Sequence, residues 1–217
     1  MILHQGVIPS TQWTRAPGCE HDWDDAQLAW RPRLDAHGAT TRPGVWVAGD
    51  GGGIIGGPAA VHDGARVADA IATELADHSA APAMSAAQDR ASHASLAAHL
   101  APRPFLDRLY RPADALRLPR GNTIVCRCED VSAASGAAIL AEGCPGPNQL
   151  KFFSRCGMGP CQGRMCGTTI SEMVAAARGI PVQHAGHYRI RQPIKPLPLG
   201  VLATAAAPVE KSKAYMV

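Results

Sequence analysis

The chain has 217 residues and is 46% hydrophobic, which is enough to bury the core of one large domain or of two small ones. Its formal net charge of +3 is small and its basic residues are scattered, which argues against a nucleic-acid partner. No apolar run approaches the roughly 18 residues of a transmembrane segment, and the N-terminus lacks the pattern of a signal peptide. We therefore expect a cytoplasmic protein, or one that reaches a membrane only through a partner.

The first module, residues 1–77, mixes short apolar runs with glycine and proline. GVWVAGD, at 44–50, predicts a buried strand that ends in a turn, and the glycine-rich stretch 51–57 is unsuited to regular structure. A helix is predicted over 58–77, because Pro58 suits a first helical position. The apolar residues that fall near one face of this helix are Val61, Ala65, Ala68 and Ile71.

Residues 78–118 are rich in alanine and predict a helical linker between two modules. A weakly amphipathic helix is predicted over 86–101, and Pro102 and Pro104 end it. The residues that follow, 105–120, predict a short helix or an extended connector.

Residues 119–181 contain most of the cysteines and predict a short strand at 123–128 followed by three short helices. Asp130 or Ser132 is suited to cap the first of these helices. Glycine commonly follows the last turn of a helix, and the three helices are predicted to end near Gly143, Gly157 and Gly179. The remaining residues, 182–217, are rich in proline and predict an extended C-terminal tail.

Four cysteines form two pairs that 32 residues separate: C-x-C, then C-x4-C. A C-x-C pair is tight for a zinc site, which usually has two to four residues between paired ligands. A 2Fe–2S cluster spreads four thiolates over two irons and accepts unlike pairs. The spacing favours such a cluster over the alternatives, which are zinc, a dithiol switch and plain buried thiols. The four candidate ligands are Cys126, Cys128, Cys161 and Cys166.

CRCEDV and GMGPCQGRMC resemble the ferredoxin-like domain first known from bacterioferritin-associated ferredoxin, over about residues 124–180. This resemblance implies a small, mainly helical 2Fe–2S domain with the same four cysteines as ligands. The free-standing ferredoxin has C-x2-C as its second pair, whereas this chain has C-x4-C. Cys156 is therefore the competing ligand, while Cys144 and Cys19 are interpreted as lying outside the site.

GVWVAGDGGGIIGG resembles the second flavin-binding motif of two-dinucleotide-domain flavoproteins, and the upstream HQGVIPSTQW resembles the segment that precedes it there. The resemblance implies that Asp50 hydrogen-bonds a ribityl hydroxyl of FAD. The alternative is a plain strand–turn–helix. The residues that would give close backbone approach and form the turn are Gly49, Gly51, Gly52, Ile54, Ile55, Gly56, Gly57 and Pro58.

No G-x-G-x-x-G motif precedes Asp50, so the FAD site is incomplete in this chain. We expect an α/β remnant of a flavin- or dinucleotide-binding domain, followed by the small helical 2Fe–2S domain. Such a chain is either a truncated reading frame or a separately encoded piece of a flavin dehydrogenase.

The order of modules resembles the larger subunit of opine oxidases, hydrogen cyanide synthase and related proline or amine dehydrogenases. This resemblance implies an electron-transfer subunit, or a fragment of one, in an FAD-dependent enzyme that acts on C–N bonds. Electrons would pass from a flavin-dependent dehydrogenase subunit through the cluster to a second flavin or a downstream acceptor. RIRQPIKP, at 189–196, would lie along the subunit interface; its alternative is a solvated tail.

The alternative function is a free-standing ferredoxin-like module without catalytic activity. The sequence predicts no catalytic acid, base or nucleophile. His62 is interpreted as a packed or surface imidazole, and His184 and His187 as surface groups.

Overall fold

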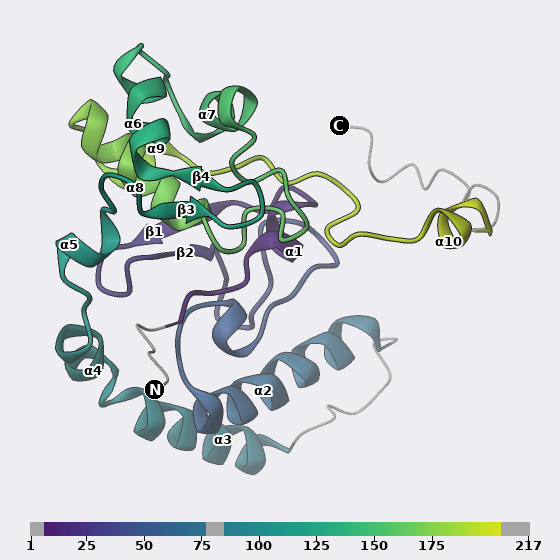
Figure 1. Cartoon of the computed structure of the whole chain (residues 1–217). Coiled ribbons are helices and arrows are strands. Elements are labelled where there is room, and N and C mark those ends of the chain that lie inside the picture. The colour runs from purple at the N-terminus through teal and green to yellow at the C-terminus, as the bar shows by residue number, and fades with distance from the viewer. Residues whose placement is uncertain (1–6, 77–84, 205–217) are drawn as a thin grey trace, which may run out of the picture.

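The computed structural model describes residues 7–76 and 85–204. This part of the chain is rich in helix and holds only two small antiparallel strand pairs. A helical pair lies at one end, the cysteine-bearing helices lie at the other, and the first strand pair lies between them (Figure 1). No helix in the described ranges is both long enough and apolar enough to cross a bilayer.

The N-terminal part begins with α1 (Gln12–Arg15), followed by β1 (His21–Asp24) and β2 (Ala29–Pro32). The two strands pair antiparallel with Trp23 opposite Trp30, and the two indole rings meet edge to face with centroids 5.6 Å apart. Aromatic pairs across a strand ladder stabilise this kind of isolated hairpin.

The buried strand predicted over 44–50 is wrong. Within these residues only an isolated bridge from Trp46 to Ala39 forms, and a 3-10 helix, η1 (Gly49–Gly51), follows. A strand persists when a neighbour satisfies its backbone groups, and in the described part of the chain no strand runs beside this segment. The irregular backbone predicted for most of 51–57 is confirmed.

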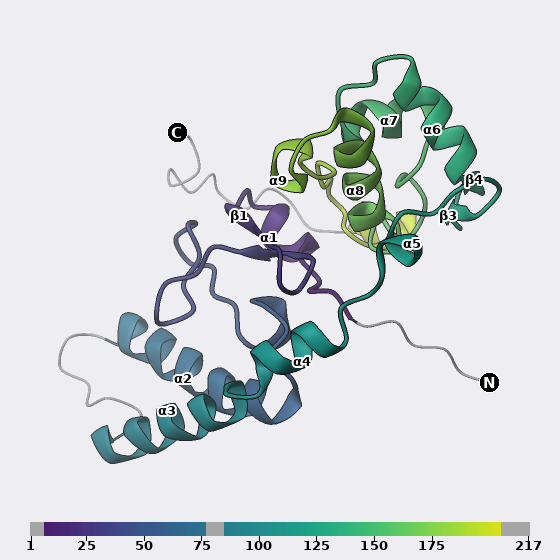
Figure 2. The same ribbon diagram turned by 90° about the vertical axis from the view of Figure 1, so that its left-hand side faces the viewer.

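The two predicted long helices are confirmed as α2 (Gly57–Leu75) and α3 (Ala86–Leu100). They lie side by side (Figure 2). The imidazoles of His62 and His99 stack between them with ring centroids 5.6 Å apart. The buried face of α2 is not the predicted one. Val61, on the predicted apolar face, is 71% exposed, whereas Ala59 and Val67 are buried.

Two short helices connect this pair to the cysteine-bearing module: α4 (Arg103–Leu109) and α5 (Asp114–Arg117). The connector predicted after Pro104 is thus largely helical. Arg103 and Asp107 form an ion pair one turn apart on α4.

The cysteine-bearing module begins with β3 (Ile124–Cys126) and β4 (Val131–Ser132), and the three predicted helices are confirmed. The Ser132 hydroxyl caps the first helix by accepting a hydrogen bond from the Ser135 amide. Gly179 ends the last in the left-handed conformation. The helices are α6 (Ala133–Ala141), α7 (Pro147–Ser154) and α8 (Gly167–Arg178).

The segment after residue 181, for which an extended tail is predicted, has neither helix nor strand over residues 186–198 but holds a short helix on each side, and residues 205–217 lie outside the described residues. The segment contains α9 (Val182–Ala185) and α10 (Leu199–Thr204). Ala185 and Tyr188 belong to the same buried cluster as Cys126, Cys156 and Cys166, so residues 182–188 complete the core of the cysteine-bearing module.

Candidate functional site

Two loops bring the cysteines together. The first is the turn between β3 and β4, which follows the buried Cys126 and carries the exposed Cys128. The second runs from the end of α7 to the start of α8, where Arg155 adopts a left-handed conformation and stops α7. The Arg155 guanidinium pairs with Glu129 at 2.8 Å, which ties the second loop to the first.

Three thiols form a buried group: Cys126, Cys156 and Cys166. Their sulfur atoms all lie within 4.8 Å of one another, and each residue is at most 1% exposed. Two of the three are among the ligands that the sequence predicts, and the third is the competitor. Thiolates at such distances are suited to hold a soft metal centre.

The other two predicted ligands, Cys128 and Cys161, form a pair beside this group. Their thiols hydrogen-bond each other, and Cys128 also lies close enough to Cys126 to interact with its charge. The structure thus places two of the four predicted ligands in the buried group with Cys156, and the other two in a hydrogen-bonded pair whose Cys128 is within electrostatic reach of Cys126.

The Cys156 thiol loses its proton more readily than the Cys166 thiol. Hydrogen bonds from Cys166, Tyr188 and Cys126 to its sulfur outweigh its burial and lower its pKa to about 7. The same hydrogen bond, together with burial and like charge, raises the pKa of Cys166.

Tyr188 covers the cysteine loop, a contact that sequence reasoning missed because this residue lies in a proline-rich stretch. An added Cβ would lie 2.6 Å from the ring at Gly157 and 2.7 Å from it at Gly163. Both glycines also have positive φ, so the loop needs glycine at these positions for backbone conformation as well as for space.

The two remaining cysteines lie outside this cluster, as expected. The Cys144 thiol is 3.5 Å from the carbonyl oxygen of Gly146, and the Cys19 thiol is 3.3 Å from the Thr40 hydroxyl. Both are buried as single thiols, which behave as small apolar groups.

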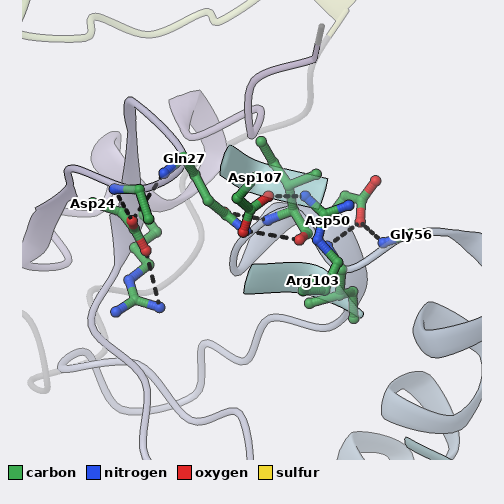
Figure 3. A network of polar contacts seen from close by, with 10 residues as sticks. Asp24, Gln27, Asp50, Gly56, Arg103 and Asp107 are labelled. Atoms are coloured by element: carbon green, nitrogen blue, oxygen red, sulfur yellow. Dashed lines mark hydrogen bonds and ion pairs between the residues drawn. The ribbon is translucent and has the colours of Figure 1, made fainter. Parts of the chain in front are cut away.

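The carboxylate of Asp50 organises the glycine-rich turn. One oxygen of the Asp50 carboxylate accepts hydrogen bonds from the amides of Ile55 and Gly56, at 2.9 and 2.8 Å (Figure 3). Asp63, from α2, accepts a third bond from the Gly49 amide at 2.8 Å. The turn is therefore held closed by two carboxylates, one within it (Asp50) and one on the helix that follows it (Asp63).

Gln27 fixes this turn to α4 and was not predicted as a site residue. Its side-chain amide donates to the Ile54 carbonyl and accepts from the Ile54 amide, and it also donates to Asp107 (Figure 3). Single-sequence spacing gives no signal for this contact, because 80 residues separate Gln27 from Asp107.

A buried ion pair fixes the connector to α8. Glu172 is 5% exposed, and its carboxylate lies 2.5 Å from the Arg117 guanidinium. Burial raises the pKa of Glu172 although the arginine opposes the shift.

His62 is confirmed as a packed imidazole and His184 as an exposed one, but His187 is not a free surface group. Its ring packs edge to face on Trp30 at 5.2 Å and on His21 at 6.0 Å. The segment after α9 therefore contacts the first strand pair.

Both the sequence and the fold of the chain are similar to those of known proteins. Residues 120–206 match the family model of the sarcosine oxidase A3 domain. The fold also matches the crystal structure of L-proline dehydrogenase from P. horikoshii, with a TM-score of 0.69, over 91% of this chain and 37% of that chain. At 22% identity this likeness establishes the fold alone.

The particular relatives are subunits of oxidoreductases. The A subunit of opine oxidase from Rhizobium meliloti (strain 1021) is 43% identical over 95% of this chain, and that from Agrobacterium tumefaciens (strain Ach5) is 45% identical over 94%. The HcnB subunit of hydrogen cyanide synthase from Pseudomonas aeruginosa is 38% identical over 91%. The resemblance to these subunits is thus confirmed. The chain spans only 44%, 40% and 42% of their respective lengths.

Proposed function

We propose that this chain is an electron-transfer subunit, or part of one, of an FAD-dependent oxidoreductase that acts on C–N bonds of opines, amino acids or amines. The observation that carries the proposal is a buried group of three cysteines next to the Cys128–Cys161 pair, in a chain related to the A subunit of opine oxidase. The partner would be a flavin-dependent dehydrogenase subunit, and no residue of this chain is assigned to bond cleavage.

The donor set fits a 2Fe–2S cluster. Four of five thiols would hold it: Cys126, Cys128 and Cys161, with Cys166 as the fourth ligand and Cys156 as its competitor. When bound, such a cluster accepts and releases one electron at a time. The backbone N–H groups of Met165, Gly163 and Arg164 hydrogen-bond the Cys161 sulfur, where they would stabilise negative charge.

The glycine-rich turn supports a partial FAD site. Gly56 and Gly57 open the 19-residue helix α2, and no atom lies within 4 Å of an added Cβ at either position. A helix N-terminus with open backbone of this kind favours negatively charged ligand groups. Asp50 is exposed beside it, so a ribityl hydroxyl would bind at its carboxylate.

One observation favours the second candidate, a ferredoxin-like module without its own flavin. The Asp50 carboxylate already accepts two backbone hydrogen bonds, so the turn is closed without a ligand. In this case the N-terminal part would be a structural support for the cysteine-bearing module.

Anaerobic purification tests the cluster. We expect stoichiometric iron and inorganic sulfide, charge-transfer absorption bands, and an electron-spin signal after reduction with dithionite. Zinc in place of iron would refute the cluster. Serine at Cys144 or Cys19 is the control and leaves the iron content unchanged.

Co-expression with a flavin-dependent dehydrogenase subunit of the opine oxidase type separates the two functions. If the chain is an electron-transfer subunit, the two proteins should form a stable complex and flavin should co-purify with it. If the chain carries iron but neither retains FAD nor associates with such a subunit, the second function holds.

A further inference from the structure

A small pocket lies where the N-terminal part meets the cysteine-bearing module. It has a volume of about 200 Å³, and Arg15 and Trp30 line one side. Gly163 and Arg164 of the cysteine loop line the other side, together with Tyr188. At about 30 Å³ per water molecule, the pocket has room for roughly six waters or for one small molecule.

Two buried N–H donors in this wall have no hydrogen-bond partner among the described residues: Nη1 of Arg15 and the indole Nε1 of Trp30. The Tyr188 hydroxyl, also in this wall, has no oxygen or nitrogen partner there and lies against the Cys156 sulfur. Trp30 is only 8% exposed, so bulk water does not solvate its N–H group. A buried N–H without a partner costs free energy, and native structures rarely leave two of them beside one cavity.

The contacts that the described residues 7–76 and 85–204 make with the Arg15 side chain are to neutral groups. Its Nε donates to the Thr11 hydroxyl at 2.8 Å, and its guanidinium lies 5.2 Å from the centre of the Trp30 ring. Both contacts position the guanidinium, but neither supplies a negative charge. A buried cation normally has an anionic partner.

The charges around the pocket have one sign. Among the described residues that line it there are two arginines, Arg15 and Arg164, and no aspartate or glutamate. The nearby His21 is held neutral at neutral pH, because burial and the charge of Arg15 lower its pKa to about 4. Burial lowers the pKa of Arg15 to about 9, which still leaves it protonated at neutral pH.

We propose that this pocket binds a small oxyanion group, a carboxylate or a phosphate, through the Arg15 guanidinium and the Trp30 indole N–H. The bound group supplies the missing charge and accepts from both donors at once. Tyr188 also lines the pocket, and its hydroxyl contacts Cys156. The Tyr188 side chain therefore lies between the bound group and the cysteine cluster.

Calorimetric titration of the purified full-length chain with acetate, inorganic phosphate and acetamide tests the proposal. Acetate and phosphate distinguish a carboxylate from a phosphate site, and acetamide is the neutral analogue of acetate. We expect millimolar or tighter binding of at least one anion and none of acetamide.

The variant Arg15→Met should weaken anion binding at least tenfold. Trp30→Phe should weaken it several-fold, because phenylalanine keeps an aromatic ring but removes the N–H donor. Arg108→Met is the matched control, since Arg108 is exposed on α4 away from the pocket, and it should bind normally.

Thermal unfolding separates a ligand site from a structural arginine. The anion should raise the melting temperature of the wild type and of Arg108→Met but not that of Arg15→Met. Failure of both anions to bind the wild type would overturn the proposal. The proposal would also be overturned if Arg15→Met bound the anion as tightly as the wild type. A third contrary result is a difference in melting temperature between Arg15→Met and the wild type that is the same with and without anion.

Discussion

Gly159 and Cys128 touch across the two cysteine loops: a Cβ added at Gly159 would lie 2.2 Å from the Cβ of Cys128 and 3.2 Å from its sulfur. The Cys128 Cβ is attached to the backbone, so it cannot move aside without moving its loop. Close approach of the two loops, and with it the pairing of Cys128 with Cys161, therefore depends on a glycine at this position.

Gly159→Ala should separate the loops. We expect a loss of about 1–3 kcal/mol in the free energy of unfolding, as for other overpacked sites, and a lower iron content after anaerobic purification. Urea unfolding and iron analysis check the two effects. Gly64→Ala is the control, because Gly64 lies within α2 with no atom within 4 Å of an added Cβ, and there alanine should stabilise the chain.

The sequence predicts the helices of the cysteine-bearing module well, because local signals define them: Ser132 caps α6, and Gly179 ends α8. It predicts the strand at 44–50 wrongly, because an apolar run does not report whether a neighbouring strand exists to pair with it. The spacing of the cysteines indicates a cluster, but it cannot show that Cys156 lies between Cys126 and Cys166. Tyr188 carries no local signal at all, since its partners are glycines more than 20 residues away. The predicted domain boundaries after residues 77, 118 and 181 stay predictions.

His21 should make stability depend on pH. Burial, and then the charge of Arg15, lowers its pKa from 6.5 to about 4 in the folded chain. The unfolded chain therefore binds more protons between these values, and stability falls as pH drops from about 6.5 toward 4. We expect this residue to account for roughly 1–3 kcal/mol of the loss, given its partial exposure. His21→Gln should flatten the pH profile of urea midpoints in this range, whereas His184→Gln, at an exposed site, should leave it unchanged.

Removing one partner of the ion pair between Glu172 and Arg117 should cost more stability than removing one partner of a surface pair. Glu172→Gln removes the charge from a 5% exposed position and leaves the guanidinium with Asp114 as its remaining partner. We expect a loss of about 1–3 kcal/mol at neutral pH by urea unfolding. The double variant Arg117→Met/Glu172→Leu should recover most of this loss, since an apolar pair needs no charge compensation. If the loss of the double variant relative to the wild type equals the sum of the losses of Arg117→Met and Glu172→Leu, the pair is not coupled.

Asp50 should stabilise the glycine-rich turn even when no ligand is bound, because its carboxylate accepts two backbone hydrogen bonds there. Asp50→Ala removes the acceptor for the Ile55 and Gly56 amides and should cost about 1 kcal/mol in unfolding free energy. Asp50→Asn keeps a carbonyl acceptor, so it should cost less. Hydrogen exchange at the two amides reads the effect directly, with faster exchange in the alanine variant. Unchanged exchange there would show that the carboxylate does not close the turn.

The fourth cluster ligand can be decided by comparing Cys156→Ser with Cys166→Ser. Both sulfur atoms lie within 4.8 Å of Cys126, but a 2Fe–2S cluster takes four thiolates and five thiols are present. We therefore expect only one of the two variants to lose the charge-transfer bands and the iron, while the other keeps both. Cys126→Ser, Cys128→Ser and Cys161→Ser should each lose them, which sets the reference for a missing ligand. Loss in both Cys156→Ser and Cys166→Ser would mean that the fifth thiol is needed to fold the loop, and retention in both would contradict a four-cysteine cluster at this site.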